Sequence, residues 1–426
     1  MNNTINRLII IGNGFDLAHG MKTKYKDFVN GYLEQEIGKH RGSQSPKKTE
    51  DKLMSIIPSK DSVDMLRDEY NDNLTPKQNL DKVRACGYEV KLSPFFETII
   101  EKIENKNWVD IEYAYYEYLC DINKPELSKE EVSEKIDELN EEMKCITSEL
   151  AKYLRKQDAE YENTNDAEMI LEIIRPLRHQ EIAVSAEEDW KEFVAQRKKS
   201  PNSFSFYGSD FNKLTDKGKV YDGYKSDDTV QSDGDTVRSD GDTVHKLFPG
   251  KVFLLNFNYT TNSESSIISW LSSACNEKQL SHHIHGDLED KKNSIIFGYG
   301  DDSDEMYKKL LDKNDNRFLE NDKTVKYLGS ARYRNFFGFI ESAPFQVCIM
   351  GHSCGISDRT LLSTIFQHEN CVSIKPYFYE NGDNDDYYEI IKNISRCFDD
   401  KKLMRDRVVN KDYCEPLPQP GKNKNR

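Results

Sequence analysis

The sequence predicts an α/β protein with a Rossmann-like, mostly parallel sheet that a large helical insert interrupts. Short apolar runs of strand character lie near the N-terminus and in the last third of the chain, and a long polar stretch of helical periodicity separates them. The late runs, which lie in KVFLLNFNYT, SHHIHGD, NSIIFGYGDD and FQVCIMGHSCGISD, are each predicted to be a buried strand. They alternate with helical segments, as is typical of parallel sheets. Each run ends in small or polar residues, and ligands of such sheets collect beyond the carboxyl ends of the strands.

The first strand is predicted in the stretch RLIIIGNGFDLAHG, where the residues from Leu8 to Ile11 are apolar and largely β-branched. Gly12 and Gly14 then allow a tight turn and a close approach to a ligand. At the start of a helix, free N–H groups favour an anion such as a phosphate. The G-x-G-x-x-G fingerprint is incomplete because Leu17 holds its third glycine position, so an ordinary strand-to-helix turn is an equally good interpretation.

Composition narrows the class of protein. The 426 residues carry a formal net charge of −15 with a pI near 5.2, which argues against a protein that grips the nucleic-acid backbone. No apolar run is long enough to cross a bilayer, and the N-terminus lacks the pattern of a secretory signal. We therefore expect a cytoplasmic protein without a membrane partner. The nine cysteines include no C-x-x-C pair, so neither a zinc site nor a disulfide framework is predicted.

Periodicity and composition divide the chain into four parts. The Rossmann-like nucleotide-binding domain is expected over residues 1–35 and 246–400, and the helical insert over 36–225. An acidic repeat loop follows the insert at 226–245, and a polar C-terminal tail is expected over 401–426.

The helical insert is best defined by the stretch KEEVSEKIDELNEEMKCITSELAKYLRK. Its apolar residues recur at alternating steps of four and three, which predicts a long helix packed against partner helices. These residues are Val132, Ile136, Leu139, Met143, Ile146, Leu150 and Tyr153. Aromatic stretches around Trp108 and Trp190 fit the same insert, where their rings most simply serve as packing.

The loop at 226–245 holds three near-copies of a seven-residue unit, in the stretch SDDTVQSDGDTVRSDGDTVH. Acidic residues and glycines with one valine per unit cannot bury a core, so a disordered or loosely ordered loop is predicted. The spacing lacks the alternating acidic ligands and the closing glutamate of an EF-hand loop, and calcium is not expected.

The run KVFLLNFNYT leads to Asn256, Asn258 and Tyr259. An asparagine at a strand end can orient a ribose hydroxyl or a water without ionising. Its simpler role is to cap the next helix from a turn. The sequence leaves both roles open.

Three histidines follow in the stretch SHHIHGD. Strand alternation places His283 and His285 on one face and His282 on the other, and no nearby cysteine completes a metal site. We therefore expect no metal. A histidine before a glycine at a strand end suits a general base, because its ordinary pKa lies near working pH. For a histidine taken alone, a structural role is the commoner case.

The run FQVCIMGHSCGISD supplies Gly351, Ser353 and Asp358. Gly351 and Ser353 can approach a ribose or a phosphate, whereas Asp358 is also at home at the start of the next helix. Ser353 lies in a G-x-S-x-G pattern like the nucleophile elbow of α/β-hydrolases. That chemistry needs an acid and then a histidine downstream. The only downstream histidine, His368, lies fifteen residues on, inside the elbow's own predicted helix, so the triad is not favoured.

In chain order these motifs resemble the AbiH family of bacterial phage abortive-infection proteins. The resemblance rests on LIIIGNGFDLAHGMKTKYKDF near the N-terminus and on NFNYT, HIHG, GYGDD and GHSCGISD in the last third. The motif order is in turn similar to the sirtuin-type NAD-binding fold of many antiphage NAD-hydrolysing effectors. The resemblance implies a phage-defence role, with NAD as the bound nucleotide.

The resemblance also implies roles for single residues. Asn258 takes the place of the catalytic asparagine, and His285 takes that of the catalytic histidine. The cofactor-binding residues expected with them are Gly12, Asn13, Gly14, Asp16, Tyr259, Gly351, Ser353 and Asp358. Thr260 stands where the sirtuin-type motif has an aspartate, and the four-cysteine zinc module of protein-deacylating sirtuins is absent, so deacylation is not implied.

The resulting hypothesis is an abortive-infection effector that binds NAD and hydrolyses its nicotinamide–ribose bond, with Asn258 orienting the ribose and water and His285 as general base. The alternative is a nucleotide-binding sensor or interaction protein that does no chemistry. A third class is a hydrolase or nuclease acting on another nucleotide, for which the sequence offers no obvious metal-binding carboxylates. The partners left open are a phage trigger, a partner defence protein and a second copy of the chain.

Overall fold

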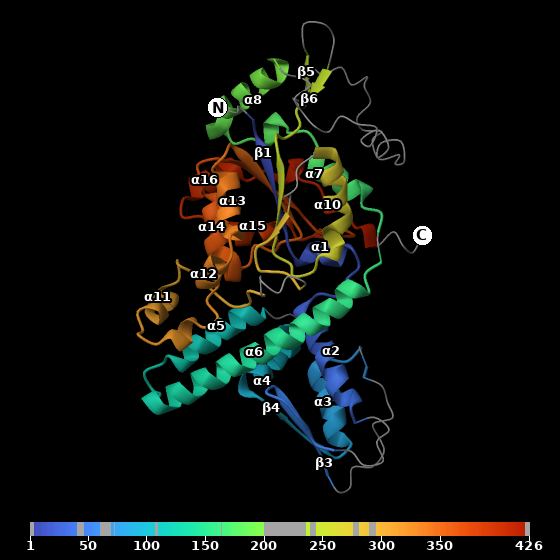
Figure 1. Cartoon of the computed structure of the whole chain (residues 1–426), viewed down its shortest axis with the longest axis vertical. Helices are drawn as coiled ribbons and strands as arrows, with labels where there is room; N and C mark the ends of the chain where they lie inside the picture. The colour runs from blue at the N-terminus through green and yellow to red at the C-terminus, as the bar shows by residue number, and fades with distance from the viewer. Residues whose placement is uncertain are drawn as a thin grey trace. The chain divides into compact units, whose positions relative to one another are not determined.

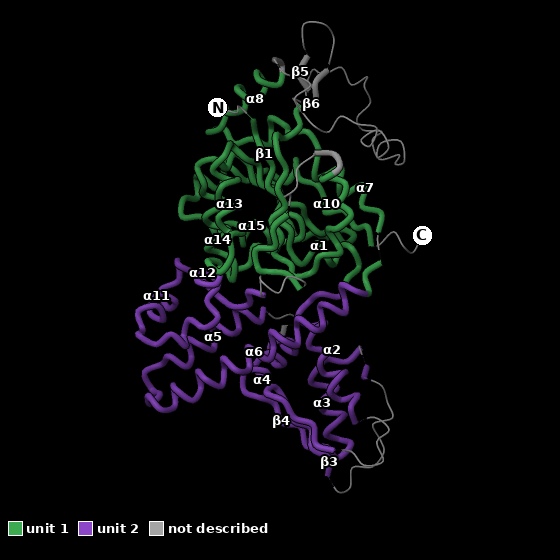
Figure 2. The backbone as a smooth tube through the Cα atoms, viewed as in Figure 1, with its two compact units in different colours: residues 1–21, 160–293, 327–426 green, residues 22–159, 294–326 purple. Residues whose placement is uncertain are grey.

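The computed structural model describes most of the chain, which forms two compact units (Figure 1, Figure 2). The described residues are 4–40, 47–59, 70–71, 73–106, 110–162, 164–199, 236–238, 244–275, 281–288 and 295–421. Unit 1 comprises residues 1–21, 160–293 and 327–426, and unit 2 comprises residues 22–159 and 294–326. Within the described ranges, no helix is both long and apolar enough to cross a membrane.

Unit 1 is built around a five-stranded sheet in which every neighbouring pair of strands is parallel. Its strands are β1 (Asn6–Ile11), β7 (Val252–Asn256), β8 (Ser281–His283), β9 (Phe345–Met350) and β10 (Cys371–Tyr377). The spatial order is β10-β9-β1-β7-β8, so the chain first builds outward from β1 to one edge and then builds the other. This is a Rossmann order, and its switch point lies between β1 and β9. The predicted α/β class with a parallel sheet is confirmed.

Helices cover both faces of this sheet. They are α1 (Asn13–Ala18), α7 (Ala167–Ile174), α8 (Glu187–Lys199), α10 (Asn262–Cys275), α13 (Arg332–Ile340), α14 (Arg359–Phe366), α15 (Tyr387–Arg396) and α16 (Lys401–Arg407). Ile9 and Ile11 of β1 pack in one cluster with residues of α7 and α10. On the other face, Phe253 of β7 stacks on Phe339 of α13, with ring centroids 4.8 Å apart. Burial of both faces explains why the strands read as continuous apolar runs.

Short elements complete unit 1. The 3₁₀ turns are η1 (His179–Glu181), η2 (Val184–Ala186), η5 (Tyr327–Gly329), η6 (Ile356–Asp358) and η7 (Lys411–Tyr413). Two small antiparallel pairs are β5 (Thr236–Arg238) with β6 (Val244–Lys246) and β11 (Glu380–Asn381) with β12 (Asn384–Asp385).

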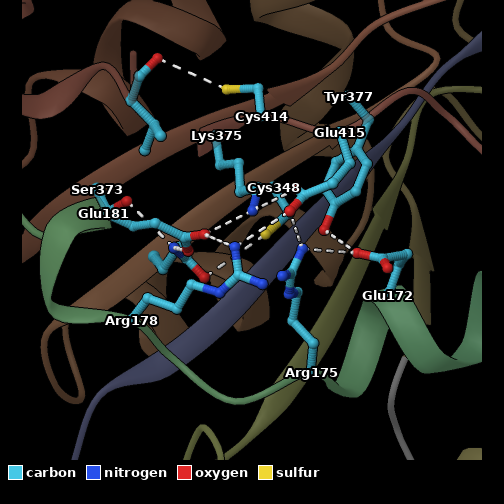
Figure 3. A network of polar contacts seen from close by, with 12 residues as sticks. Glu172, Arg175, Arg178, Glu181, Cys348, Ser373, Lys375, Tyr377, Cys414 and Glu415 are labelled. Atoms are coloured by element: carbon cyan, nitrogen blue, oxygen red, sulfur yellow. Dashed lines mark hydrogen bonds and ion pairs between the residues drawn. The ribbon is translucent and has the colours of Figure 1, made fainter. Parts of the chain in front are cut away.

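A set of buried and half-buried charged side chains, here called the β10 charge network, lies against the sheet, and all of its members except Arg7 are labelled in Figure 3. It consists of Arg7, Glu172, Arg175, Arg178, Glu181, Lys375 and Glu415. Lys375 is fully buried in β10, and its Nζ lies 2.6 Å from a carboxylate oxygen of Glu181 and 2.6 Å from one of Glu415. Removing one partner of a buried pair leaves an uncompensated charge. The network therefore ties both the η1 segment and the C-terminal segment to the sheet.

The segment from residue 401, which composition predicts as a polar tail, packs within unit 1 up to the last described residue. It begins with α16, and Val408 then forms a parallel bridge with Ile374 of β10. The side chain of Leu417 is 4% exposed and belongs to the core cluster around Ile9. Polar composition alone does not show this, because the contacts are made by a few apolar residues and by backbone pairing.

Unit 2 combines a helical group with a small antiparallel sheet. Its helices are α2 (Tyr25–Gly38), α3 (Pro76–Ala85), α4 (Pro94–Lys106), α5 (Ile111–Ile122), α6 (Lys129–Ala159), α11 (Glu305–Leu311), η4 (Asn316–Leu319) and α12 (Lys323–Lys326), and its strands are β2 (Thr49–Glu50), β3 (Met54–Pro58) and β4 (Tyr88–Leu92). The strand order is β2-β3-β4. Residues 160–199, which periodicity places in the insert, belong to unit 1.

The long helix predicted in the insert is α6. It packs against α2, α4 and α5, and the middle of its apolar seam is buried. The buried seam residues are Ile136, Leu139, Met143, Ile146 and Leu150. Val132 and Tyr153, at the two ends of the seam, are partly exposed. The predicted seam therefore faces partner helices, as expected.

The stretch NSIIFGYGDD does not form the expected strand of the parallel sheet, so this expectation is wrong. Its described residues belong to unit 2, where Tyr299 makes only an isolated bridge with Asp322. The backbone N–H of Gly298 donates instead to Glu112 at 3.0 Å, and the same carboxylate pairs with Lys323 at 3.0 Å. A Cβ atom at Gly298 would overlap the carbonyl oxygen of Asn321, so this close approach requires a glycine.

The structure describes only part of the acidic repeat loop, and of the two predicted aromatic stretches it describes the residue Trp190 but not Trp108. Within the acidic repeats, β5 and β6 pair as an antiparallel hairpin, and the other residues of 226–245 before β6 lie outside the described residues, as does Trp108. Trp190 lies on α8 of unit 1, 7% exposed, and its ring packs 5.7 Å from that of Phe193. Its predicted packing role is confirmed.

The α6 seam leads to a stability prediction. Replacing Leu139, which is 1% exposed, with aspartate is expected to cost several kcal/mol of unfolding free energy, because the new carboxylate would be buried without a partner. Lys144→Asp places the same residue at a site on α6 where the side chain is 80% exposed, and should unfold at the parental denaturant midpoint. Equal midpoints for Leu139→Asp and the parent, measured by circular dichroism, would contradict the packing of α6.

Candidate functional site

Two loops meet at the switch point of the sheet. The backbone N–H of Gly14, after β1, donates to the carbonyl of Gly351, after β9, at 2.7 Å. A Cβ atom at Gly12 would lie 2.6 Å from Cα of His352, and one at Gly351 would overlap the backbone of Phe15. Gly351 also has a φ of +75°, which suits glycine. These glycines are therefore required by the packing of the two loops, so the glycine pattern does not by itself indicate a phosphate.

Asn258 extends from the end of β7 toward the same place. Its Nδ2 donates to the carbonyl of Gly12 at 3.1 Å, and the residue is 7% exposed. Its backbone N–H is held by Oδ1 of Asn256 at 2.8 Å. The turn-forming role that the sequence left open is thus filled by Asn256, whereas the Asn258 amide is directed at the opening loop.

His285 is joined to a second histidine through one carboxylate. Its Nε2 lies 3.2 Å from Oδ1 of Asp358, and Nε2 of His352 lies 3.4 Å from Oδ2 of the same side chain. Nδ1 of His352 accepts the N–H of Cys354 at 2.9 Å. The proton of a neutral His352 ring therefore sits on Nε2, which faces Asp358 as a donor. Asp358 thus fixes the orientation of both rings.

Asp358 precedes α14, where an aspartate is often a helix cap. Here its side chain makes no capping hydrogen bond and is directed to the two histidines instead. Tyr327 adds a further contact, since its hydroxyl lies 3.0 Å from Nε2 of His285. A carboxylate that is not needed by its helix but orients a histidine is the arrangement found beside a general base.

Aromatic rings enclose the pair. Phe257 packs edge-on against both histidine rings, with centroid distances of 5.1 Å to His285 and 4.3 Å to His352. The ring centroid of Tyr259 lies 6.3 Å from that of His285. His285 is 3% exposed. The histidine cluster is therefore shielded from bulk water in this structure.

Other residues predicted to bind the nucleotide lie in different settings. Asp16 is 1% exposed, and its carboxylate accepts hydrogen bonds from the hydroxyls of Thr260 at 2.6 Å and Ser263 at 2.7 Å. This geometry connects α1 to the start of α10 and fits a structural role. Asn13, the first residue of α1, and Ser353, in the loop after β9, are exposed.

The serine-hydrolase alternative finds no support in the local backbone. The strained residue of the G-H-S-C-G turn is Cys354, with a φ of +53°, and not Ser353. Cys354 is buried, and burial raises the pKa of its thiol well above the ordinary value. His368 lies 3.5 Å from a carboxylate oxygen of Glu341. Cys354 therefore does not have the surroundings of a nucleophile, and His368 does not have those of its base.

His282 and His283 have different surroundings, as strand alternation predicts. The ring of His282 stacks on Phe253 at 4.9 Å, and burial lowers its pKa to about 4. His283 contacts Asn258 and Glu264. Among the residues that the structure describes, no group of three His, Cys, Asp or Glu side chains is arranged to hold a metal ion.

Sequence reasoning missed two residues of the cluster, His352 and Tyr327. One signal for His352 was available. It lies six residues before Asp358, and the two residues flank a turn at the end of a predicted strand. Tyr327 gives no such signal, because it comes from a segment between predicted elements. The similarity to the sirtuin-type fold stays a prediction.

Comparison with known proteins gives a family. The model of the family described as bacteriophage abortive infection AbiH matches residues 8–379, a range that includes the loop after β1, Asn258, His285 and Asp358. No curated protein and no solved structure matches the chain. With most of its length matched by one family model, the chain belongs to the AbiH family of bacteriophage abortive-infection proteins.

Proposed function

We propose that this chain acts in abortive infection by binding NAD and hydrolysing its nicotinamide–ribose bond. The observation that carries the proposal is the pairing of His285 with Asp358, at the edge of a Rossmann-ordered sheet where Asn258 also ends. A histidine oriented by a carboxylate suits a general base. A neutral asparagine amide suits the orientation of a ribose hydroxyl or a water.

The nucleotide would lie at the switch point between β1 and β9, where ligands of such sheets bind. Asn256, which pairs with the last residue of β1 from the end of β7, gives separate support for a ligand at this edge of the sheet. Its side chain is fully buried, and within the described part of the chain its Nδ2 has no hydrogen-bond acceptor. Leaving a buried donor unsatisfied costs about 1–3 kcal/mol. An oxygen of a bound nucleotide could supply the acceptor, so the residues at this edge fit a polar ligand.

In the proposed reaction, water attacks C1′ of the ribose and the bond from C1′ to the nicotinamide nitrogen breaks. The electron pair of that bond leaves with nicotinamide, and His285 accepts the proton of the water. With the proton of the ring on Nε2, toward Asp358, the lone pair is on Nδ1. Positive charge builds on the ribose as the bond breaks, and a water-poor site with fixed dipoles stabilises it. The low exposure of His285 and Asn258 is consistent with this requirement.

The test is direct. Purified full-length protein incubated with NAD is expected to release nicotinamide and ADP-ribose, measured by liquid chromatography against a blank without protein. Calorimetry on the same preparation measures NAD binding. Binding without release would contradict hydrolysis and leave a nucleotide-binding sensor as the function. Absence of both binding and release would overturn the proposal.

A further inference from the structure

His283 occupies a position that the proposed chemistry does not use. It ends β8, is 7% exposed, and faces an acceptor with each of its ring nitrogens. Nδ1 lies 2.9 Å from the backbone carbonyl of Asn258, and Nε2 lies 2.7 Å from Oε1 of Glu264 on α10. A carbonyl oxygen and a carboxylate can only accept hydrogen bonds. Both ring nitrogens are therefore best satisfied when both carry protons.

The surroundings of His283 favour that charged form. Burial opposes the charge, but the Glu264 carboxylate and the hydrogen bonds that His283 donates to Glu264 and to the Asn258 carbonyl raise the pKa of His283 overall. The other charged or titratable groups around it are Asp287 after β8, Arg332 on α13, which donates to the His283 carbonyl at 3.1 Å, and the neighbouring His282. Arg332 is itself paired with Asp287 at 3.0 Å, so its charge is largely balanced.

We infer that His283 is a positioning residue, which as a doubly donating imidazolium clamps the backbone of Asn258 between β8 and the start of α10. The clamp acts on the carbonyl of Asn258, while the side chain of Asn258 reaches Gly12. Misplacement of a substrate-orienting group by about 1 Å can cost about 10²-fold in rate. The inference rests on the proposed function for the role of Asn258 in catalysis, but the charge of His283 and the placement of Asn258 can be measured without substrate.

The sign of the pH effect follows from the direction of the shift. Because the pKa of His283 is higher in the folded protein than in the unfolded chain, its contribution is fully present below the ordinary histidine pKa and is lost as pH rises through the folded value. His285 must instead lose its proton to act as a base. Nicotinamide release is therefore expected to rise with pH on the acid side and to fall on the alkaline side as His283 deprotonates.

The first experiment reads the clamp itself. Full-length protein labelled with ¹⁵N at histidine and asparagine is titrated by NMR. His283 is assigned by its loss in His283→Asn, and Asn258 by its loss in Asn258→Ala. Both ring nitrogens of His283 should be protonated at neutral pH, and the side-chain amide signal of Asn258 should shift as His283 deprotonates. The inference would be overturned if His283 is neutral at pH 7. It would also be overturned if the side-chain amide signal of Asn258 does not change while His283 titrates.

The second experiment uses matched variants. His283→Ala should lower kcat about 10²-fold with little change in KM, and His283→Asn, which keeps a donor toward the Asn258 carbonyl, should recover most of that loss. Glu264→Gln should move the alkaline limb of the pH profile to lower pH, since the Glu264 carboxylate raises the pKa of His283. The Glu264→Gln variant also keeps the inference testable if His283→Ala fails to fold. The exposed pair of His179 with Glu187 supplies the control, and His179→Asn should match the parent.

The outcomes separate the two proposals. If the parent releases no nicotinamide, the proposed function fails, and the NMR titration alone decides whether His283 clamps Asn258. If the parent is active but His283→Ala keeps the parental kcat, or Glu264→Gln keeps the parental alkaline limb, the positioning role is contradicted while the proposed function stands.

Discussion

Replacing His285 with alanine is expected to lower the rate of nicotinamide release about 10²–10⁴-fold, the range that a general base contributes. The reason is local, since Asp358 holds the ring at 3.2 Å and no other described histidine has this setting beside Asn258 except His352, whose Nδ1 is engaged with Cys354. NAD binding measured by calorimetry should persist, because the loops at the switch point are positioned by backbone contacts rather than by His285.

The matched control for this variant is His282→Gln. His282 is three residues away but stacks on Phe253, and a pKa lowered to about 4 keeps it neutral at working pH. Its replacement should leave the rate near that of the parent. If His285→Ala releases nicotinamide at the parental rate, or if His282→Gln loses as much activity as His285→Ala, the assignment of the base is wrong.

The sheet could be predicted from sequence because its strands are buried on both faces and therefore appear as continuous apolar runs. Leu8 to Ile11 and the runs before Asn258 and Gly351 form β1, β7 and β9 as expected. The run in NSIIFGYGDD has the same composition but forms no sheet strand. Apolarity predicts burial, whereas the partner that covers a run is decided by distant contacts such as the one between Gly298 and Glu112.

The candidate site was predictable in outline for a topological reason. Parallel strands place their carboxyl ends at one edge, so Asn258 and His285 could be assigned to it from the order of motifs alone. The hydrogen-bond partners of these residues could not be predicted from the sequence. Asp358 precedes α14 like a helix cap, and only the three-dimensional arrangement shows that its carboxylate faces His285 and His352 instead.

Polar composition misled in the opposite way at the C-terminus. Glu415 lies in a segment that composition marks as a tail, yet its carboxylate pairs with Lys375 and Arg175. Charged residues are expected at the surface unless they are paired. Sequence reasoning cannot recognise a buried pair whose members lie far apart in the chain, and here the partners come from β10 and from the residue that follows α7.

Replacing Glu181 with alanine is expected to destabilise unit 1 by about 3–5 kcal/mol, the cost of breaking a buried ion pair from one side. The side chain of Glu181 is fully buried. Its Oε1 lies 2.6 Å from Nζ of Lys375 (Figure 3). Its Oε2 accepts a hydrogen bond from Nε2 of Gln346 at 3.0 Å. The variant would leave the Lys375 ammonium dependent on Glu415 alone and the Gln346 amide with one partner fewer.

The sign of the charge imbalance makes this test specific. The β10 charge network contains four cationic side chains and three carboxylates, so removing Glu181 widens the excess of positive charge, whereas Lys375→Met removes it. Lys375→Met should therefore lose less stability than Glu181→Ala, because it leaves three cationic side chains against three carboxylates, and Nη1 of Arg178 still lies 3.8 Å from Glu181 and 3.2 Å from Glu415. Tryptophan fluorescence during denaturant unfolding suits the measurement, since Trp190 and Trp270 lie in unit 1.

The control variant is Glu389→Ala, which removes a 71% exposed partner of Lys392 and should keep the parental midpoint. Equal midpoints for Glu181→Ala and Glu389→Ala would show that the network does not hold η1 and the C-terminal segment on the sheet.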